Sequence, residues 1–182
     1  MTRKMTGKMS RRLVIDASVA RSAGETEDPV SKRCREFLLA ALTICHKLVV
    51  TRELEKEWNK HQSGFFISWR VAMTSADKED DRGSLHDEKF RKKIEKLGLS
   101  ESEEAAALKD AHLIEAARDT DCAVASRDDT VRKIYKRASD RVREVKPIAW
   151  VNPVKNSESP LEWLKSGARN DPERTLGKKK KH

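Results

Sequence analysis

Long apolar runs are missing from this sequence, and their absence sets the first limit on what the protein can be. A membrane-spanning helix needs about 18 or more apolar residues in a row, and no run here approaches that length. Residues 1–12 are basic and polar and precede only a short apolar run, which is not the pattern of a signal peptide. We therefore expect a cytoplasmic protein.

Cysteine is also scarce. The three cysteines are Cys34, Cys45 and Cys122, an odd number without any CxxC spacing, which argues against a disulfide framework and a zinc site. All three stand among apolar neighbours, so we expect buried, reduced thiols. Nothing in the sequence pairs one of these thiols with a histidine as its base, so we do not expect a catalytic cysteine.

The middle of the chain carries no net charge. The net charge is +9, of which residues 1–12 carry +5 and residues 168–182 carry +4, so residues 13–167 are balanced. Basic tails bind polyanions without sequence preference, which fits a nucleic-acid partner, although many such tails only add solubility.

The length of 182 residues, with 37% hydrophobic residues, predicts one packed domain and tails. We place the domain at 10–151, with a helical segment at about 60–98. Residues 1–9 form a basic N-terminal tail in this division, and residues 152–182 form a basic C-terminal extension.

Short apolar runs alternate with segments of helical periodicity. Strands are expected at 12–16, 48–50, 121–126 and 145–151. Helices are expected at 29–46, in parts of 52–73, and at 86–97, 100–118, 129–138 and 161–164, with a mobile loop and no strand at 75–84. This alternation predicts an α/β fold with a parallel sheet and helices on both faces.

Two aspartates stand where predicted strands end. Asp16 closes the run Leu13-Val14-Ile15, and Asp128 follows the run that ends at Ser126. Ligands of parallel sheets bind outside the carboxyl ends of the strands, so these side chains can approach the same cation. Each could equally be an ordinary turn or helix-capping aspartate.

Asp110 carries a stronger signal. It shares a helical stripe with Ala107, Ile114 and Ala117, so the carboxyl group is expected to face the core. A buried carboxylate needs a cation or several hydrogen bonds. The position therefore predicts a functional acid.

A fourth acid, Glu57, lies beside Trp58 at the edge of an apolar stripe. Taken alone it is a surface glutamate that can pair with Lys60 or another nearby basic residue. Glu53 could take its place, and Asp129 could take that of Asp128.

Around these acids the sequence resembles the PIN-domain ribonucleases over about residues 12–150. The motifs are, in order, Val14-Ile15-Asp16-Ala17-Ser18, Leu54-x-x-Glu57-Trp58, Asp110-Ala111-His112-Leu113-Ile114-x-Ala116-Ala117 and Val124-Ala125-Ser126-Arg127-Asp128. The helical segment between Glu57 and Asp110 is longer than in compact members such as the VapC toxins, and the lysine-rich C-terminal extension is an addition.

This resemblance implies a three-layer α/β/α sandwich with a central parallel sheet and an acidic cluster that binds Mg²⁺ or Mn²⁺. It implies catalytic roles for four residues, namely Asp16, Glu57, Asp110 and Asp128. The three aspartates would hold metal, and Glu57 would bind or orient a second metal or the attacking water. The implied reaction is hydrolysis of RNA to 5′-phosphate and 3′-hydroxyl ends.

Further expectations concern substrate and partners. Arg127 is a candidate for holding the RNA backbone, and Ser126 for positioning the scissile phosphate or simply fixing the turn. The apolar cluster within 65–73 is expected to be core, or a groove that an antitoxin protein or a second copy of the chain covers. His112 is expected to point away from Asp110.

Two other classes of function stay open. One is an RNA-binding scaffold that keeps the PIN fold without catalysis. The other is a phospho-acceptor or phosphatase in which Asp16 is the nucleophile, although Lys146 is a poor match for the lysine that such proteins need.

Overall fold

The computed structural model describes residues 10–177. The predicted basic N-terminal tail, residues 1–9, and the last part of the predicted C-terminal extension, residues 178–182, lie outside the described residues. The described part of the chain contains no helix long and apolar enough to cross a membrane.

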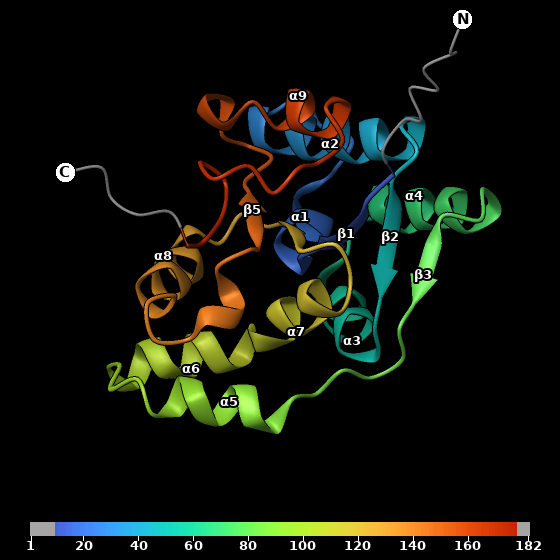
Figure 1. Cartoon of the computed structure of the whole chain (residues 1–182). Coiled ribbons are helices and arrows are strands. Elements are labelled where there is room, and N and C mark those ends of the chain that lie inside the picture. The colour runs from blue at the N-terminus through green and yellow to red at the C-terminus, as the bar shows by residue number, and fades with distance from the viewer. Residues whose placement is uncertain (1–9, 178–182) are drawn as a thin grey trace, which may run out of the picture.

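A five-stranded parallel sheet forms the centre of the molecule (Figure 1). Its strands, in the order β3-β2-β1-β4-β5, are β3 (Glu79–Asp81), β2 (Lys47–Val50), β1 (Arg12–Ile15), β4 (Ala123–Ala125) and β5 (Ala149–Val151). The four predicted strands are present, although the last begins at Ala149 and not at residue 145, because a 3₁₀ turn occupies Arg143–Val145. β1 is the middle strand. On one side of it lie β2 and β3, from the first half of the sequence, and on the other side lie β4 and β5, from the second half.

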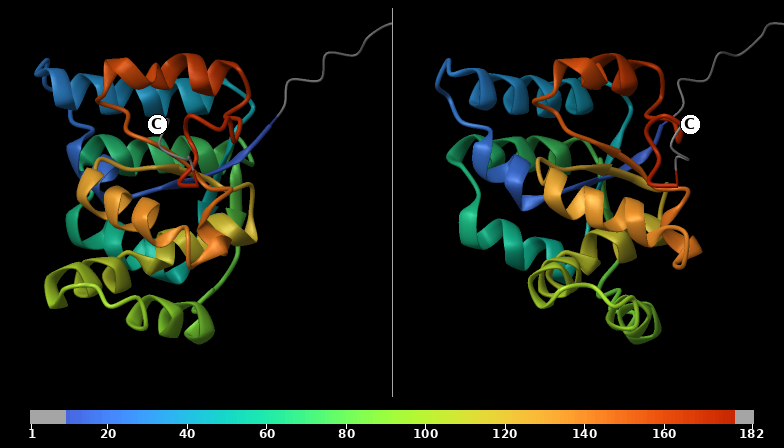
Figure 2. Two further views of the ribbon diagram at one scale, coloured as in Figure 1. Left: turned by 60° about the vertical axis from the view of Figure 1, so that its left-hand side comes forward. Right: turned by 90° about the vertical axis from the view of Figure 1, so that its left-hand side faces the viewer.

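Helices cover both faces of the sheet, as the predicted α/β class requires (Figures 1 and 2). They are α1 (Ala17–Ser22), α2 (Pro29–Thr43), α3 (Arg52–His61), α4 (Gly64–Ser75), α5 (Glu88–Glu95), α6 (Glu101–Lys109), α7 (Ala111–Asp119), α8 (Asp129–Ala138) and α9 (Pro160–Lys165), with 3₁₀ turns at Arg143–Val145 and Asn156–Glu158. Helices α2 and α9 pack together on one side, whereas α7 packs on β1 and β4, and α5 and α6 lie farther out on that side. The arrangement is consistent with a three-layer α/β/α sandwich.

Side-chain caps fix where several helices begin. Thr51 accepts a hydrogen bond from the Leu54 amide at 3.1 Å, and Ser100 accepts one from the Glu103 amide at 3.3 Å. Such caps satisfy amide groups that have no partner within the helix. The cap at Thr51 sets the first turn of α3 and therefore the direction in which this helix presents Glu57.

The third strand corrects the sequence prediction, which placed a mobile loop at 75–84. β3 pairs with β2 at the edge of the sheet, and the Leu48 amide donates to the Lys78 carbonyl at 2.7 Å. Its sequence, Glu79-Asp80-Asp81, has no apolar alternation, because an edge strand bonded on one side can keep its side chains near solvent. Arg70 pairs with Glu79, and Arg12 pairs with Asp80.

The single helix predicted at 100–118 is wrong, because the structure has two helices that meet at Asp110. This residue ends α6 and precedes α7, with φ −97° and ψ 9°. Helix α6 packs against α5 and α8, whereas α7 packs against the sheet and α3. Residues 111–117 are all buried, so α7 must enter the core while α6 stays above it.

The segment expected as a C-terminal extension belongs to the same core as far as it is described. Trp163, Leu164 and Leu176 are buried, and α9 packs on α2. Thr175 also forms an antiparallel bridge with Ala149 of β5. Residue 152 therefore does not separate a tail from the domain, because the apolar side chains after it complete the cover over the sheet.

Surface and thiol predictions were met only partly. Cys34 is buried as expected, but Cys45 is exposed because it follows the end of α2, and Cys122 is half-buried. All three are free thiols.

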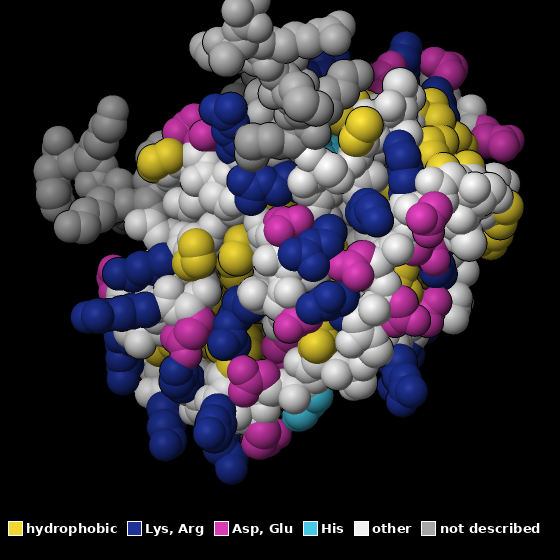
Figure 3. All heavy atoms as spheres, turned by 45° about the vertical axis from the view of Figure 1, so that its right-hand side comes forward, with side chains coloured by type: hydrophobic (Ala, Val, Ile, Leu, Met, Phe, Trp, Pro, Cys, Tyr) yellow, Lys and Arg dark blue, Asp and Glu magenta, His cyan; other side chains and the backbone are white. Residues whose placement is uncertain are grey.

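In the apolar cluster of α4, Phe66, Trp69 and Met73 are core residues, but Ile67 and Val71 are exposed. Figure 3 shows Lys and Arg interspersed with Asp and Glu over one face, in line with the balanced charge of residues 13–167.

Candidate functional site

Asp16 lies at the carboxyl end of the central strand. Ile15 pairs with Ala125 of β4, and the Asp16 amide donates to the Ala125 carbonyl at 2.9 Å. The residues that follow β1 and β4 therefore leave the same edge of the sheet side by side. Because β1 separates the half of the sheet that carries β2 from the half that carries β4, this edge is the switch point at which parallel sheets bind ligands.

Two serine hydroxyls hold one oxygen of the Asp16 carboxylate. Ser18 Oγ donates to Oδ2 at 2.5 Å, and Ser126 Oγ donates to the same atom at 2.8 Å. Asp16 does not cap α1 with its side chain, which removes the ordinary explanation for an aspartate at this place. The side chain is buried and fixed, with Oδ1 left for another ligand.

Ser126 links Asp16 to Asp128. Its hydroxyl oxygen accepts a hydrogen bond from the Asp128 amide at 3.0 Å while its proton goes to Asp16. Ser126 is completely buried, so the hydroxyl fixes the turn and is not exposed to a substrate. Ser18 plays a parallel part, because its oxygen accepts the Arg127 amide at 3.0 Å. Sequence reasoning missed Ser18, although its place two residues after Asp16 was a usable signal.

Asp128 also has the capping role that the sequence left open. Its Oδ1 accepts the Val131 amide at 2.9 Å, at the start of α8. Asp129, the alternative acid, is engaged elsewhere, since Lys155 Nζ lies 2.8 Å from its Oδ2. Only Asp128 of this pair is among the charges that act on Asp110.

Asp110 brings the four predicted acids into one electrostatic group. Burial raises the pKa of its carboxyl group to about 7, and the negative charges of Asp16, Asp128 and Glu57 add to the rise. The charge of Lys109 opposes this rise only in part. Neighbouring carboxylates raise the pKa of a carboxyl group when they stand near it. Asp110 is therefore largely protonated below neutral pH when no cation is bound.

Glu57 stands on the cationic side of this group. A hydrogen bond from Lys60, at 2.7 Å to Oε1, lowers the pKa of Glu57, and the charges of Lys60, His112 and Lys109 lower it further. The surface pairing with Lys60 that the sequence offered as an alternative is thus present, together with the approach to Asp110. Glu53 accepts a hydrogen bond from the Ser84 hydroxyl instead.

Trp58 fixes this part of α3 to the sheet. Its indole Nε1 donates to the Ile15 carbonyl at 2.9 Å, directly before Asp16, and the Arg70 guanidinium lies 4.8 Å from the centre of its ring. The indole bond couples the position of Glu57 to the end of β1. Glu57 therefore reaches the acidic group from a helix that the core holds firmly.

The expectation that His112 points away from Asp110 stays a prediction. It assumed one continuous helix through Asp110, and the break between α6 and α7 removes that basis. The charge of His112 is one of those that lower the pKa of Glu57. Its Nδ1 is 3.0 Å from the Lys109 carbonyl oxygen.

The donor chemistry suits a hard divalent cation. Mg²⁺ and Mn²⁺ prefer carboxylate oxygens, and Asp16 and Asp128 at this edge of the sheet both act on the Asp110 carboxyl group. Within residues 10–177, no three His, Cys, Asp or Glu side chains are grouped tightly enough to hold a metal ion. Carboxylates repel one another when no cation lies between them.

The remaining candidates for substrate binding have structural partners. The Arg127 guanidinium bonds the Ser22 hydroxyl of α1. In the described part of the basic N-terminal stretch, Arg11 bonds Asn170 and Arg12 bonds Asp121. These two arginines stand at the amino end of β1, the edge opposite Asp16.

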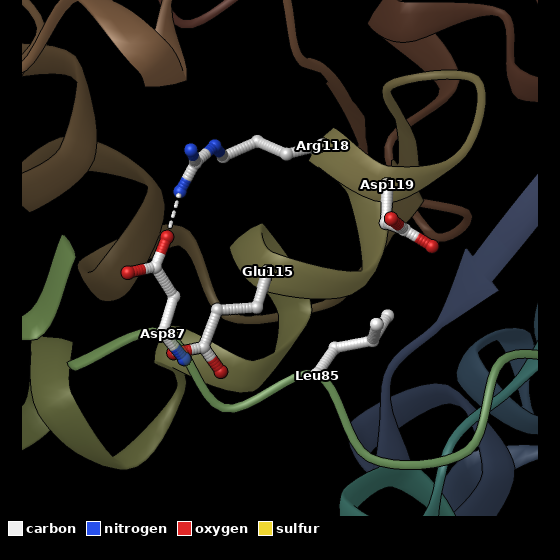
Figure 4. A pocket seen from close by; sticks show the side chains of 5 residues that line it. All are labelled: Leu85, Asp87, Glu115, Arg118 and Asp119. Carbon is white, nitrogen blue, oxygen red and sulfur yellow. Dashed lines mark hydrogen bonds and ion pairs between the residues drawn. The ribbon is translucent and has the colours of Figure 1, made fainter. Parts of the chain in front are cut away.

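A separate hollow of about 210 Å³ is lined by Leu85, Asp87, Glu115, Arg118 and Asp119 (Figure 4). None of the four predicted site acids lines it. Its charges are paired, because Arg118 bonds Asp87 at 3.1 Å, Arg91 bonds Glu115 at 2.8 Å, and Asp119 bonds Arg82. Ion pairs line the hollow and connect α7 to the segment before α5.

Comparison with protein-family models finds no match to this chain, and comparison with curated proteins finds none either.

Proposed function

We propose that this protein is a metal-dependent endoribonuclease of the PIN type, which hydrolyses RNA phosphodiester bonds at Asp16, Glu57, Asp110 and Asp128. The observation that carries the proposal is the buried Ser126 hydroxyl that joins Asp16 to Asp128 at the carboxyl ends of β1 and β4. The raised pKa of Asp110, caused by burial and by the charges of the other three acids, is in line with it. Carboxyl groups at the switch point of a parallel sheet can bind a divalent cation, which neutralises their charges.

In this proposal Asp16, Asp110 and Asp128 hold Mg²⁺ or Mn²⁺. Asp16 would offer Oδ1, because the hydroxyls of Ser18 and Ser126 both bond Oδ2. Asp110 must give up its proton to bind a cation, so cation binding and proton release are coupled. A bound cation would lower the pKa of a water molecule and would stabilise charge on phosphate oxygens.

Glu57 has a different task from the three aspartates. Its pKa is lowered by the bond from Lys60, so the carboxylate is ionised at neutral pH and can accept a hydrogen bond from the attacking water or hold a second cation. Lys60 and Lys109, on the same side, would attract the phosphate backbone. The expected products carry 5′-phosphate and 3′-hydroxyl ends.

The experiment is cleavage of a panel of end-labelled RNA oligonucleotides in Mn²⁺ or Mg²⁺, with EDTA and the Asp16→Asn variant as controls. Asp77→Asn is a matched control, because it makes the same isosteric change at an exposed residue. We expect cleavage that EDTA abolishes and that falls roughly 100-fold or more in Asp16→Asn only. Equal cleavage by Asp16→Asn would contradict the proposed site.

The alternative is a catalytically inactive PIN scaffold that binds RNA. RNA binding without cleavage by the wild-type protein, in either cation, would favour it. The capping of α8 by Asp128 favours the inactive scaffold, because a capping role needs no metal.

The biological setting is a further part of the proposal. We propose a cytoplasmic protein, and a toxin that an antitoxin neutralises is one such setting. The exposed Ile67 and Val71 of α4 are where an antitoxin or a second copy of the chain would pack. Growth arrest on expression, relieved by a co-expressed partner, would support the toxin role.

A further inference from the structure

His112 is the one histidine of the described chain that combines burial with an unpaired ring nitrogen. The residue is 7% exposed, and its Nε2 is buried without any hydrogen-bond partner among the described residues. Buried polar atoms nearly always have a partner, so this atom calls for an explanation. His46, which is also buried, uses both ring nitrogens, one with the Arg11 amide and one with the Leu164 carbonyl.

The other ring nitrogen decides the state of Nε2. Nδ1 lies 3.0 Å from the Lys109 carbonyl oxygen, which can only accept a hydrogen bond. Nδ1 therefore carries a proton, and a neutral ring keeps its lone pair on Nε2. This is the arrangement found in metal-binding histidines, in which a bond from one ring nitrogen to a carbonyl fixes the other for the metal.

The ring also lies beside the proposed site. His112 is two residues beyond Asp110 in the first turn of α7, and α7 packs against α3, which carries Glu57. The groups that act on Glu57 are Lys60, Lys109 and His112. The Glu57 carboxylate and the unpaired imidazole nitrogen thus belong to two helices that pack against each other.

We propose that His112 Nε2 and Glu57 form a second cation subsite, which prefers Mn²⁺ to Mg²⁺. Imidazole nitrogen suits transition metals, whereas Mg²⁺ is held by oxygen ligands, so the nitrogen supplies the preference. Two protein ligands leave the other positions of the ion for water or for a phosphate oxygen. The inference rests on the proposed function, because it assigns the second cation of the same reaction.

The test is electron spin-echo envelope modulation of Mn²⁺ bound to the full chain, which detects a directly bound imidazole through its ¹⁴N nucleus. The main variant is His112→Asn, whose shorter amide can keep the bond to the Lys109 carbonyl but has no atom at the place of Nε2. His112→Gln is a second variant, and the exposed His86→Gln is the matched control. Circular dichroism and thermal unfolding check that each variant is folded.

We expect ¹⁴N modulation in the wild type and in His86→Gln, and its loss in both His112 variants. Titration calorimetry should show Mn²⁺ binding roughly 10-fold weaker at this subsite in His112→Asn, with Mg²⁺ binding changed less than about 2-fold. Bound Mn²⁺ without ¹⁴N modulation in the wild type would overturn the inference and leave the proposed nuclease standing. Modulation that persists in folded His112→Asn would overturn it as well.

The two proposals fail separately. If ¹⁴N modulation depends on His112 but no RNA is cut, the subsite exists and the nuclease proposal is wrong. If Mn²⁺ does not bind to the wild type at all, the subsite is wrong, and RNA cleavage in Mg²⁺ then decides the nuclease proposal by itself.

Discussion

Ser126 Oγ lies 2.8 Å from Asp16 Oδ2 and donates a hydrogen bond to it, while the same oxygen accepts the Asp128 amide at 3.0 Å. One buried hydroxyl therefore sets the positions of two acids that follow different strands. Because the hydroxyl is buried and its only proton goes to Asp16, Ser126 is a positioning residue.

Ser126→Ala is expected to lower metal-dependent RNA cleavage roughly 10- to 100-fold, the usual cost of losing a residue that orients a metal ligand. The loss should appear as weaker metal affinity, measured by titration calorimetry, and increased metal concentration should recover part of the rate. Ser139→Ala is the matched control, because Ser139 is also buried but donates to the Lys136 carbonyl. Full activity of Ser126→Ala at low metal concentration would refute this positioning role.

Asp110 should make the metal-free protein less stable as the pH rises. Its folded pKa is raised to about 7 from the ordinary 3.8, so between these values the folded state binds the proton more tightly than the unfolded state. Stability contributed by that proton is complete below about pH 4 and is lost as the pH rises through 7.

Asp110→Asn removes this loss. In EDTA at pH 8 the variant should be more stable than the wild type by about 2 to 4 kcal/mol, since one pKa unit corresponds to about 1.4 kcal/mol. Denaturant unfolding between pH 4 and 8 measures the difference, which should vanish near pH 4. Asp77→Asn should change stability by less than about 0.5 kcal/mol throughout. A gain for Asp110→Asn that is the same at pH 4 and pH 8 would show that the charge is not its cause.

Glu115 anchors the ion pairs around the hollow drawn in Figure 4. Its two carboxylate oxygens accept from Arg91 at 2.8 and 3.0 Å, and the Asp87 amide adds a third bond. Glu115→Gln is expected to lower the free energy of unfolding by about 2 to 3 kcal/mol, because it leaves a half-buried guanidinium without its charge partner.

Asp119→Asn provides the comparison, since Asp119 pairs with Arg82 near the surface. Its expected cost is below about 1 kcal/mol. Denaturant unfolding of both variants measures the contrast, and equal costs would refute a special role for burial at Glu115. RNA cleavage should be retained in both folded variants, because the hollow is separate from the four acids.

Leu176 tests whether the C-terminal segment is part of the fold. The side chain is completely buried, and its amide donates to the Ile148 carbonyl at 2.9 Å beside β5. Leu176→Ala is expected to cost about 2 to 3 kcal/mol, from lost apolar burial and the cavity left behind. The exposed Lys165→Ala should be close to neutral in the same unfolding experiment. Neutrality of Leu176→Ala would indicate a dispensable extension.

The sequence was most informative where a local pattern has one stable outcome. The run Leu13-Val14-Ile15 forms a buried strand because apolar residues on both faces require cover on both faces. Helix α8 occupies Asp129–Ala138, as its apolar spacing and the aspartate before it predict. β3 escaped prediction because its acidic residues carry no strand pattern, and only pairing with β2 makes them a strand.

For the site, the sequence by itself determined which acids were candidates, because each stands at a strand end or on an apolar stripe. Only the tertiary structure decided which of these acids lie near one another. The parallel pairing of β1 and β4 puts Asp16 beside Ser126, and the turn between α6 and α7 brings Asp110 within the field of the other acids. Hydrophobic periodicity fixes which face of a segment is buried, but contacts between distant segments depend on how those faces pack together, which no local pattern encodes.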